Sequence, residues 1–131
     1  MIKVSKKSQY GLRAMVLLAK SYGARQVLST KRISQKEDVP FDFLEKIISR
    51  MEKAGLVIGK KGVQGGYILS KSPTRINVND IVSALEGREG TVDCTFCGRS
   101  KKCLTKNVWK KIDDSINKTL KAITLKDLIR Q

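Results

Sequence analysis

Three stretches of the first half of the chain, 8–22, 30–36 and 43–54, are predicted to be helices. In the first and the third, apolar residues recur three or four positions apart, which is the spacing of one helix face, and the short second stretch is anchored by Ile33. A hydroxyl side chain before the second stretch suits a helix cap, and a glycine after the third suits a helix end. We therefore expect three helices, the last two joined by a tight turn that contains Pro40.

A short β-hairpin is expected after the third helix. The runs 56–58 and 67–69 consist of β-prone residues, and the basic, glycine-rich segment 60–66 lies between them. Asn77 and Asp80 then have the spacing of a capping box that opens a fourth helix, and a glycine closes this helix at position 87.

The last part of the chain is predicted to be a long amphipathic helix. After an aperiodic segment at 87–103, apolar residues repeat nearly every fourth position over 104–123, which predicts a helix about 28 Å long. Thr124 and Asp127 have the spacing of a cap for a last short helix at 125–129. The apolar stripe of the long helix needs a partner surface. Its members are Val108, Ile112, Ile116, Leu120 and Ile123.

The order of these elements is that of a winged helix-turn-helix, in which the second helix of the pair enters the major groove of DNA. We expect a mainly α fold with a small β-hairpin. Residues 1–87 would form the winged helix-turn-helix domain, 88–103 a cysteine-rich loop, and 104–131 a long C-terminal dimerisation helix with the short last helix. A chain of 131 residues is small enough that dimerisation adds useful burial.

The charge of the chain indicates a polyanionic partner. The sequence has 27 Lys and Arg against 12 Asp and Glu, a formal net charge of +15, and nine of the cations precede the first acidic residue, Glu37. Because cations that neutralise phosphates release condensed counterions, double-stranded DNA is the leading candidate, and a generally solvated basic surface is the alternative. The chain has no apolar run of membrane-spanning length and no signal-peptide start, so we expect a cytoplasmic protein without a membrane partner.

The polar face of the third helix carries the candidates for reading bases. Lys46 and Arg50 suit guanine or phosphate, and Glu45 suits the amino group of cytosine, although each charge also fits a solvated helix face. In the hairpin, Lys60 and Lys61 suit the phosphate backbone, and the neighbouring glycines permit a close approach. The full set of predicted DNA-binding residues is Ser5, Lys6, Lys7, Tyr10, Phe41, Asp42, Glu45, Lys46, Arg50, Lys60, Lys61 and Gly65.

All three cysteines lie close together, as Cys94-x2-Cys97-x5-Cys103. Their odd number and their polar, basic surroundings favour thiolate metal ligands over a disulfide framework. Three thiolates suit an iron-sulfur cluster or a zinc ion, and since the chain has no histidine, the fourth ligand would be Asp93, a residue of a partner subunit, water or a small thiol. Free cysteines and thiol redox sensing are the alternatives without metal.

Short motifs along nearly the whole chain point to one family. They are Ser5, 10–14, Val39, Pro40, 43–47, 53–57, 65–67, Asp80, Ile81, 84–87, the cysteine segment, 123–125, Asp127 and Leu128. Together they resemble the winged helix-turn-helix regulator family that includes the iron-sulfur biogenesis regulator IscR and the nitric oxide sensor NsrR. The resemblance implies a homodimer built on the long C-terminal helix, DNA half-sites read by the third helix and the hairpin, and a [2Fe-2S] or [4Fe-4S] cluster near that helix.

Three positions depart from the family pattern. Lys106 stands where IscR has a histidine ligand, and Gln9 stands where NsrR has an acidic ligand. These two departures leave the cluster type and the fourth ligand open. Lys61 replaces the arginine that is common in the hairpin, so a point charge takes the place of a bidentate fork.

We therefore predict a sequence-specific DNA-binding transcription regulator, such as a repressor, whose DNA binding is modulated by an iron-sulfur cluster on Cys94, Cys97 and Cys103. Iron-sulfur assembly proteins are further expected partners. The alternative is a cluster-free regulator of the same fold that responds to a metabolite, a partner protein or thiol oxidation. An enzyme is not expected, because no acid/base pair, histidine or substrate-binding motif supports catalysis.

Overall fold

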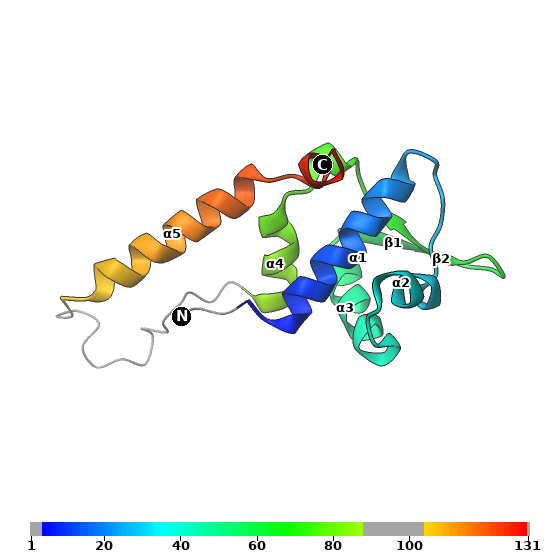
Figure 1. The fold of residues 1–131 in the computed structure, drawn as a ribbon, viewed down its shortest axis with the longest axis horizontal. Helices are drawn as coiled ribbons and strands as arrows, with labels where there is room; N and C mark the ends of the chain where they lie inside the picture. The colour runs from blue at the N-terminus through cyan, green and yellow to red at the C-terminus, as the bar shows by residue number, and fades with distance from the viewer. Residues whose placement is uncertain (1–3, 88–103, 131) are drawn as a thin grey trace.

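The computed structural model describes residues 4–87 and 104–130. Within these ranges the fold is mainly helical, with one two-stranded antiparallel sheet, as the sequence predicts. In Figure 1, α1 to α4 and the hairpin lie together, and α5 extends away from them. The cysteine-rich loop predicted at 88–103 lies outside the described residues.

Three helices form the first part of the chain. They are α1 (Lys6–Tyr22), α2 (Thr30–Glu37) and α3 (Phe41–Lys53). Ser5 caps α1 by accepting a hydrogen bond from the backbone of Ser8, so this helix begins two residues earlier than its apolar spacing predicts. Ser29 caps α2 in the same way. Between α2 and α3, Asp38 takes a left-handed conformation, which turns the chain within a few residues.

The hairpin consists of β1 (Val57–Lys60) and β2 (Gly66–Leu69), paired from Val57 with Leu69 to Lys60 with Gly66. Leu28 adds an isolated bridge to the free edge of β2: it exchanges backbone hydrogen bonds of 3.1 and 2.8 Å with Tyr67. The segment before α2 is thereby tied to the hairpin, a pairing that the sequence pattern did not predict.

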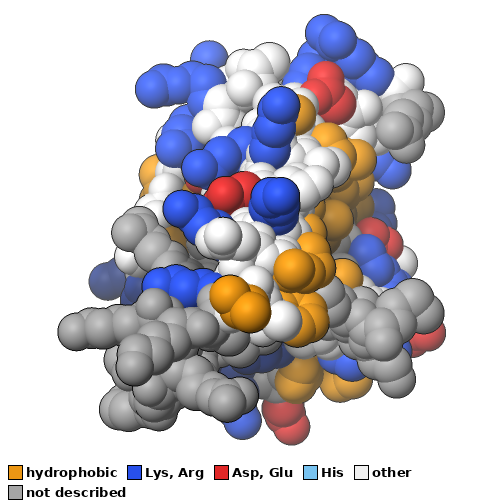
Figure 2. All heavy atoms as spheres, turned by 90° about the vertical axis from the view of Figure 1, so that its left-hand side faces the viewer, with side chains coloured by type: hydrophobic (Ala, Val, Ile, Leu, Met, Phe, Trp, Pro, Cys, Tyr) orange, Lys and Arg blue, Asp and Glu red, His pale blue; other side chains and the backbone are white. Residues whose placement is uncertain are grey.

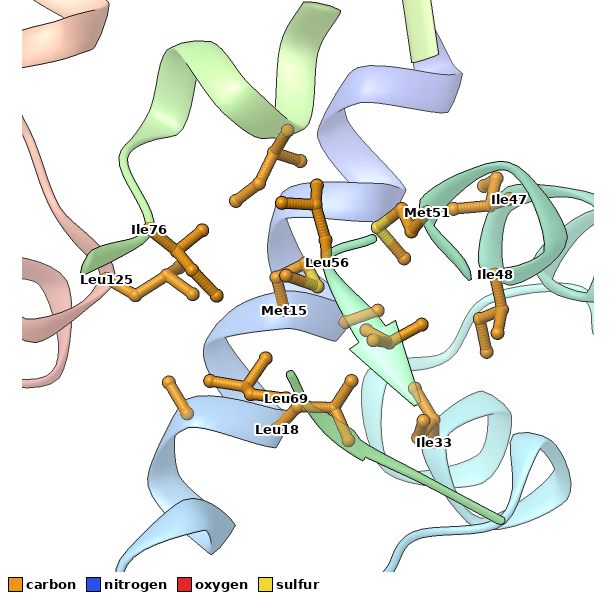
Figure 3. Close-up of a cluster of buried hydrophobic side chains, with 14 of the residues drawn as sticks. Met15, Leu18, Ile33, Ile47, Ile48, Met51, Leu56, Leu69, Ile76 and Leu125 are labelled. Carbon is orange, nitrogen blue, oxygen red and sulfur yellow. The ribbon is translucent and has the colours of Figure 1, made fainter. Parts of the chain in front are cut away.

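The core lies between α1, α3, the hairpin and α4 (Val78–Glu86), which follows a single 3-10 turn, η1 (Pro73–Arg75). Figure 3 shows Met15 and Leu18 of α1 among side chains from the other elements. The largest fully buried side chains are Met15, Leu18, Leu28, Ile33, Leu44, Ile47, Ile48, Met51, Leu69, Ile76, Ile81 and Leu85. The apolar residues that predict α1 to α4 therefore contribute to one core.

The C-terminal helices differ in their packing. α6 (Leu125–Ile129) packs against α1 and η1, and Leu125 is fully buried beside Ile76, as Figure 3 shows. α5 (Lys106–Ala122) contacts α4 but has no buried residue. Figure 2, which faces the side of the molecule that carries α5, shows hydrophobic side chains next to Lys and Arg. No helix in the described ranges combines the length and hydropathy needed to span a membrane.

Candidate nucleic-acid interface

α3 has one buried and one exposed face. Leu44, Ile47, Ile48 and Met51 point into the core. Within residues 41–50 of this helix, the exposed side chains are Phe41, Asp42, Glu45, Lys46, Ser49 and Arg50. Most of the residues predicted to read bases therefore lie on one outward face, as a recognition helix requires.

Aromatic packing holds α3 against α1. The rings of Tyr10 and Phe43 meet edge to face at a centroid distance of 5.6 Å. The cations of Lys6 and Arg13 lie 6.0 and 5.7 Å from the Tyr10 ring centroid. Tyr10, which the sequence predicts to contact DNA, is half-buried in this packing. Its ring therefore also helps to set the position of α3.

Arg13 connects the first helix of the helix-turn-helix pair to α1. Its guanidinium donates a hydrogen bond to the carbonyl of Glu37, the last residue of α2. This carbonyl lies at the negative end of the helix dipole, where a cation is favourable. Arg13 thus helps to fix α2, although its charge alone gave no sign of this role.

The hairpin presents cations and one apolar side chain. Lys60 ends β1, and Lys61 and Val63 follow in the loop, where Val63 is fully exposed. The loop is tight, because the backbone N–H of Gly65 donates to the carbonyl of Gly62 at 2.9 Å. A Cβ on Gly65 would lie 2.5 Å from the carbonyl oxygen of Lys60, so glycine is needed here for the turn itself.

Two predicted DNA contacts are engaged within the protein. The hydroxyl of Ser5 donates to the carboxylate of Glu86, and Nη1 of Arg50 donates to the carbonyl of Leu85 at 2.9 Å. Lys6, next to Ser5, is exposed, and Lys7 is half-buried. The partners of Ser5 and Arg50 both belong to α4, which the sequence did not connect with the interface.

The predicted metal ligands Cys94, Cys97 and Cys103 lie outside the described residues. Within 4–87 and 104–130, no group of three or more His, Cys, Asp or Glu side chains is arranged to hold a metal ion. Gln9 and Lys106 stand where relatives have cluster ligands. The amide of Gln9 donates to the carbonyl of Val4 at 3.0 Å. Lys106 begins α5 and is exposed.

An exposed recognition helix, a basic hairpin and a shared core define a winged-helix DNA-binding protein. The chain belongs to the Rrf2 family, described as iron-dependent transcriptional regulators, whose model matches residues 4–131. This confirms the family resemblance and the winged-helix fold, and it places the chain among regulators rather than enzymes.

Similar proteins cover almost the whole chain. Protein rrf2 of Nitratidesulfovibrio vulgaris is 35% identical and matches 98% of this chain and 88% of its own length. The structure titled "T. potens IscR" is 39% identical with a TM-score of 0.81, over 98% of this chain and 87% of that one. CymR of B. subtilis, titled the global cysteine regulator, is 35% identical with a TM-score of 0.81, over 98% and 96%.

Proposed function

We propose that this regulator acts as a homodimer that reads specific DNA sequences with α3 and contacts the phosphate backbone with its hairpin and the start of α1. The observation that carries the proposal is the exposed face of α3, which projects polar side chains from a helix whose other face is locked in the core. A cytoplasmic location follows from DNA as the partner.

The proposed contact residues divide into two groups by their chemistry. Asp42, Glu45 and Lys46, near the amino end of α3, suit base edges, with Phe41 beside them. Lys60 and Lys61, with Lys6 and Lys7, suit phosphates, and Gly65 keeps the hairpin loop tight.

Binding to a set of duplexes would test this division. Fluorescence anisotropy is measured on the duplex that the wild-type protein selects from a random pool, on single-base variants of it and on a scrambled duplex. Lys60→Met with Lys61→Met should weaken binding to every duplex and reduce the salt slope by about 0.9 per lost phosphate contact. Lys46→Met should instead change the preference at a base position, by about 1–3 kcal/mol.

Lys118→Met, which removes one positive charge from the exposed surface of α5, is the control matched in net charge to Lys46→Met. Equal losses on all duplexes for every variant, including the control, would contradict the division. A wild-type protein that ignores all duplexes at low salt would contradict DNA binding itself.

The long helix supports the homodimer. α5 spans 17 residues without one buried side chain, and Val108 and Ile116 on its apolar stripe are 50% and 39% exposed. A second copy of the stripe would remove these side chains from water.

We also propose that Cys94, Cys97 and Cys103 hold an iron-sulfur cluster supplied by iron-sulfur assembly proteins. Three thiolates within ten positions fit three ligand positions of such a cluster, and the absence of histidine leaves the fourth to Asp93, a partner subunit, water or a small thiol. When bound, a cluster would supply a group whose oxidation or loss changes charge and ligation beside the DNA-binding domain. The description of the family as iron-dependent supports this proposal.

A second candidate keeps the fold but not the cluster. The likeness to the global cysteine regulator of B. subtilis, and to a structure titled the oxidized form of Staphylococcus aureus CymR, favours regulation through thiol oxidation or a metabolite. The same three cysteines would then act as thiols.

Purification without oxygen, followed by addition of iron and sulfide, separates these candidates. A cluster gives visible absorption bands and bound iron, both lost on replacing the three cysteines with serine, and it changes the Kd for DNA. A colourless protein whose Kd responds to oxidant supports the thiol candidate. A stoichiometric zinc content would support a structural zinc loop and overturn both.

A further inference from the structure

Three helices meet at the carboxyl end of α4. A Cβ added to Gly11 of α1 would lie 2.2 Å from Cδ1 of Leu85 and 3.4 Å from Cγ2 of Ile47, so the Leu85 side chain lies where α1 approaches α3. Leu85 is fully buried there. The last turn of α4 therefore touches both the first helix and the reading helix.

The side chain of Arg50 in α3 binds the backbone at this end of α4. The last turn of α4 has no basic residue of its own, and the carbonyls of this turn carry the negative end of the helix dipole. Nη1 of Arg50 donates to the Leu85 carbonyl at 2.9 Å, so α3 supplies the cation that α4 lacks. Arg50 lies one helical turn after Lys46, and the reading face is thus anchored from its own helix.

Glu86 binds the same end of α4 to α1. A carboxylate at the carboxyl end of a helix is unfavourable to the helix dipole, so its position needs compensation. The Glu86 carboxylate accepts hydrogen bonds from the hydroxyls of Ser8, at 2.8 Å, and of Ser5, the cap of α1. Ser8 is only 2% exposed and is the buried polar side chain of the described core.

Polar contacts hold the outer side of this junction. Lys7, Arg50 and Lys53 line an open hollow together with Ala84, Leu85 and Glu86 of α4 and its C-cap Gly87. We propose that Arg50 and Glu86 are positioning residues, which fasten the reading helix and the start of α1 to one point at the end of α4. The proposal rests on the proposed DNA-binding function, and it assigns to Arg50 a role other than direct contact with DNA.

The two roles of Arg50 predict different binding data. If Arg50 touched a phosphate, removing it would reduce the salt slope by about 0.9. If it read a base, preference would relax at one position of the duplex. As a positioning residue it should weaken binding to the selected duplex by roughly two- to thirty-fold, with an unchanged salt slope.

Glu86 gives the sharper test, because charge and position predict opposite signs. Glu86→Gln removes a negative charge from a protein that binds a polyanion, so electrostatics alone predicts tighter binding. The proposal predicts weaker binding to the selected duplex, since the amide is a poorer acceptor for the two hydroxyls.

The experiment compares full-length Arg50→Gln, Arg50→Lys, Glu86→Gln and the double variant with wild type, by anisotropy over a range of salt concentrations. Lys53→Gln, a cation change on the same helix and in the same hollow, is the control. Thermal unfolding establishes that each variant is folded, and Arg50→Lys, which keeps the charge, serves if Arg50→Gln does not fold. Because both residues act on one point, the double variant should lose less binding free energy than the sum of the losses in the two single variants.

Tighter binding by Glu86→Gln, a reduced salt slope for Arg50→Gln or fully additive effects would each overturn the proposal while DNA binding by the wild type stands. If the wild-type protein binds no duplex, the proposed function fails instead, and the two failures are therefore distinct.

Discussion

Two arginines on the described surface stabilise helix ends that belong to neighbouring helices. Arg13 donates to the last residue of α2, and Arg50 donates to the penultimate residue of α4. The sequence predicts Arg50 as a DNA contact because a charged residue on the polar face of a helix faces outward in any local analysis. Its partner lies 35 positions away in the sequence, and no periodicity encodes such a contact.

Gly66 allows a close backbone approach between the hairpin and the segment before α2. A Cβ at this position would lie 2.3 Å from the carbonyl oxygen of Leu28 and 2.7 Å from the backbone nitrogen of Ser29. Neither atom belongs to a side chain that can turn away. Gly66→Ala should therefore lower the free energy of unfolding by about 1–3 kcal/mol or more, measured by urea denaturation.

Gly23→Ala is the matched control for this substitution. Gly23 has a helical φ of −61° and no atom within 4 Å of its added Cβ. The same methyl group should here leave stability unchanged or raise it by about 0.4–1 kcal/mol. Equal effects at both glycines would show that the close approach to Leu28 does not limit the fold.

At the scale of elements, local signals were predicted well and long-range ones were not. The capping boxes of α4 and α6 are both present, because each needs only two residues three positions apart. The bridge between Leu28 and Tyr67 and the 3-10 turn η1 were not predicted, because they depend on how distant segments meet. The start of α1 was placed late, since apolar spacing does not register a serine cap.

The capping box of α6 makes a pH-dependent contribution to stability. The Thr124 backbone N–H donates to the Asp127 carboxylate at 3.0 Å, and this bond, with the Thr124 hydroxyl and the charge of Arg130, holds the pKa of Asp127 below its ordinary 3.8. Because the folded pKa is lowered, this stabilisation is present above the unfolded pKa and is lost as the pH falls through the folded pKa.

Asp127→Asn should therefore be less stable than wild type at neutral pH, and the difference should shrink in acid. Urea unfolding at about pH 6 and about pH 3 measures it. Asp114→Asn, an exposed carboxylate of α5, is the control for the general removal of a negative charge. A difference at Asp127 that is the same at both pH values would rule out the carboxylate as the source.

The two ends of α4 contact different parts of the molecule. Its last turn carries the contacts to α1 and α3, and its first residue, Val78, is hydrogen-bonded at 2.8 Å to Ile123, directly after α5. In the sequence, the cysteine segment begins directly after Gly87. This segment therefore follows, along the chain, the turn of α4 that contacts α1 and α3.

At the scale of the whole molecule, the exposed stripe of α5 is the feature that a single chain leaves unexplained. A helix with no buried residue gains little from its own packing, and a 17-residue helix is marginal when isolated in water. A second chain would bury the stripe and hold two reading helices at a fixed distance, so that one DNA duplex is read at two half-sites.

Val108→Glu with Ile116→Glu should convert a dimer of the 14.6 kDa chain into a monomer, because two carboxylates would have to be desolvated in the interface. Light scattering after size exclusion measures the mass. The control, Lys110→Glu with Lys118→Glu, places acidic residues two positions further along, about 200° around the helix from the stripe, and should remain dimeric. Since α1 to α4 and α6 share a core of their own, the monomer should lose no more helical circular dichroism than the share of α5. It should bind a single half-site as wild type does, while its advantage on two half-sites disappears. A double variant that stays dimeric would exclude this face of α5 as the interface and with it the spacing of the two reading helices.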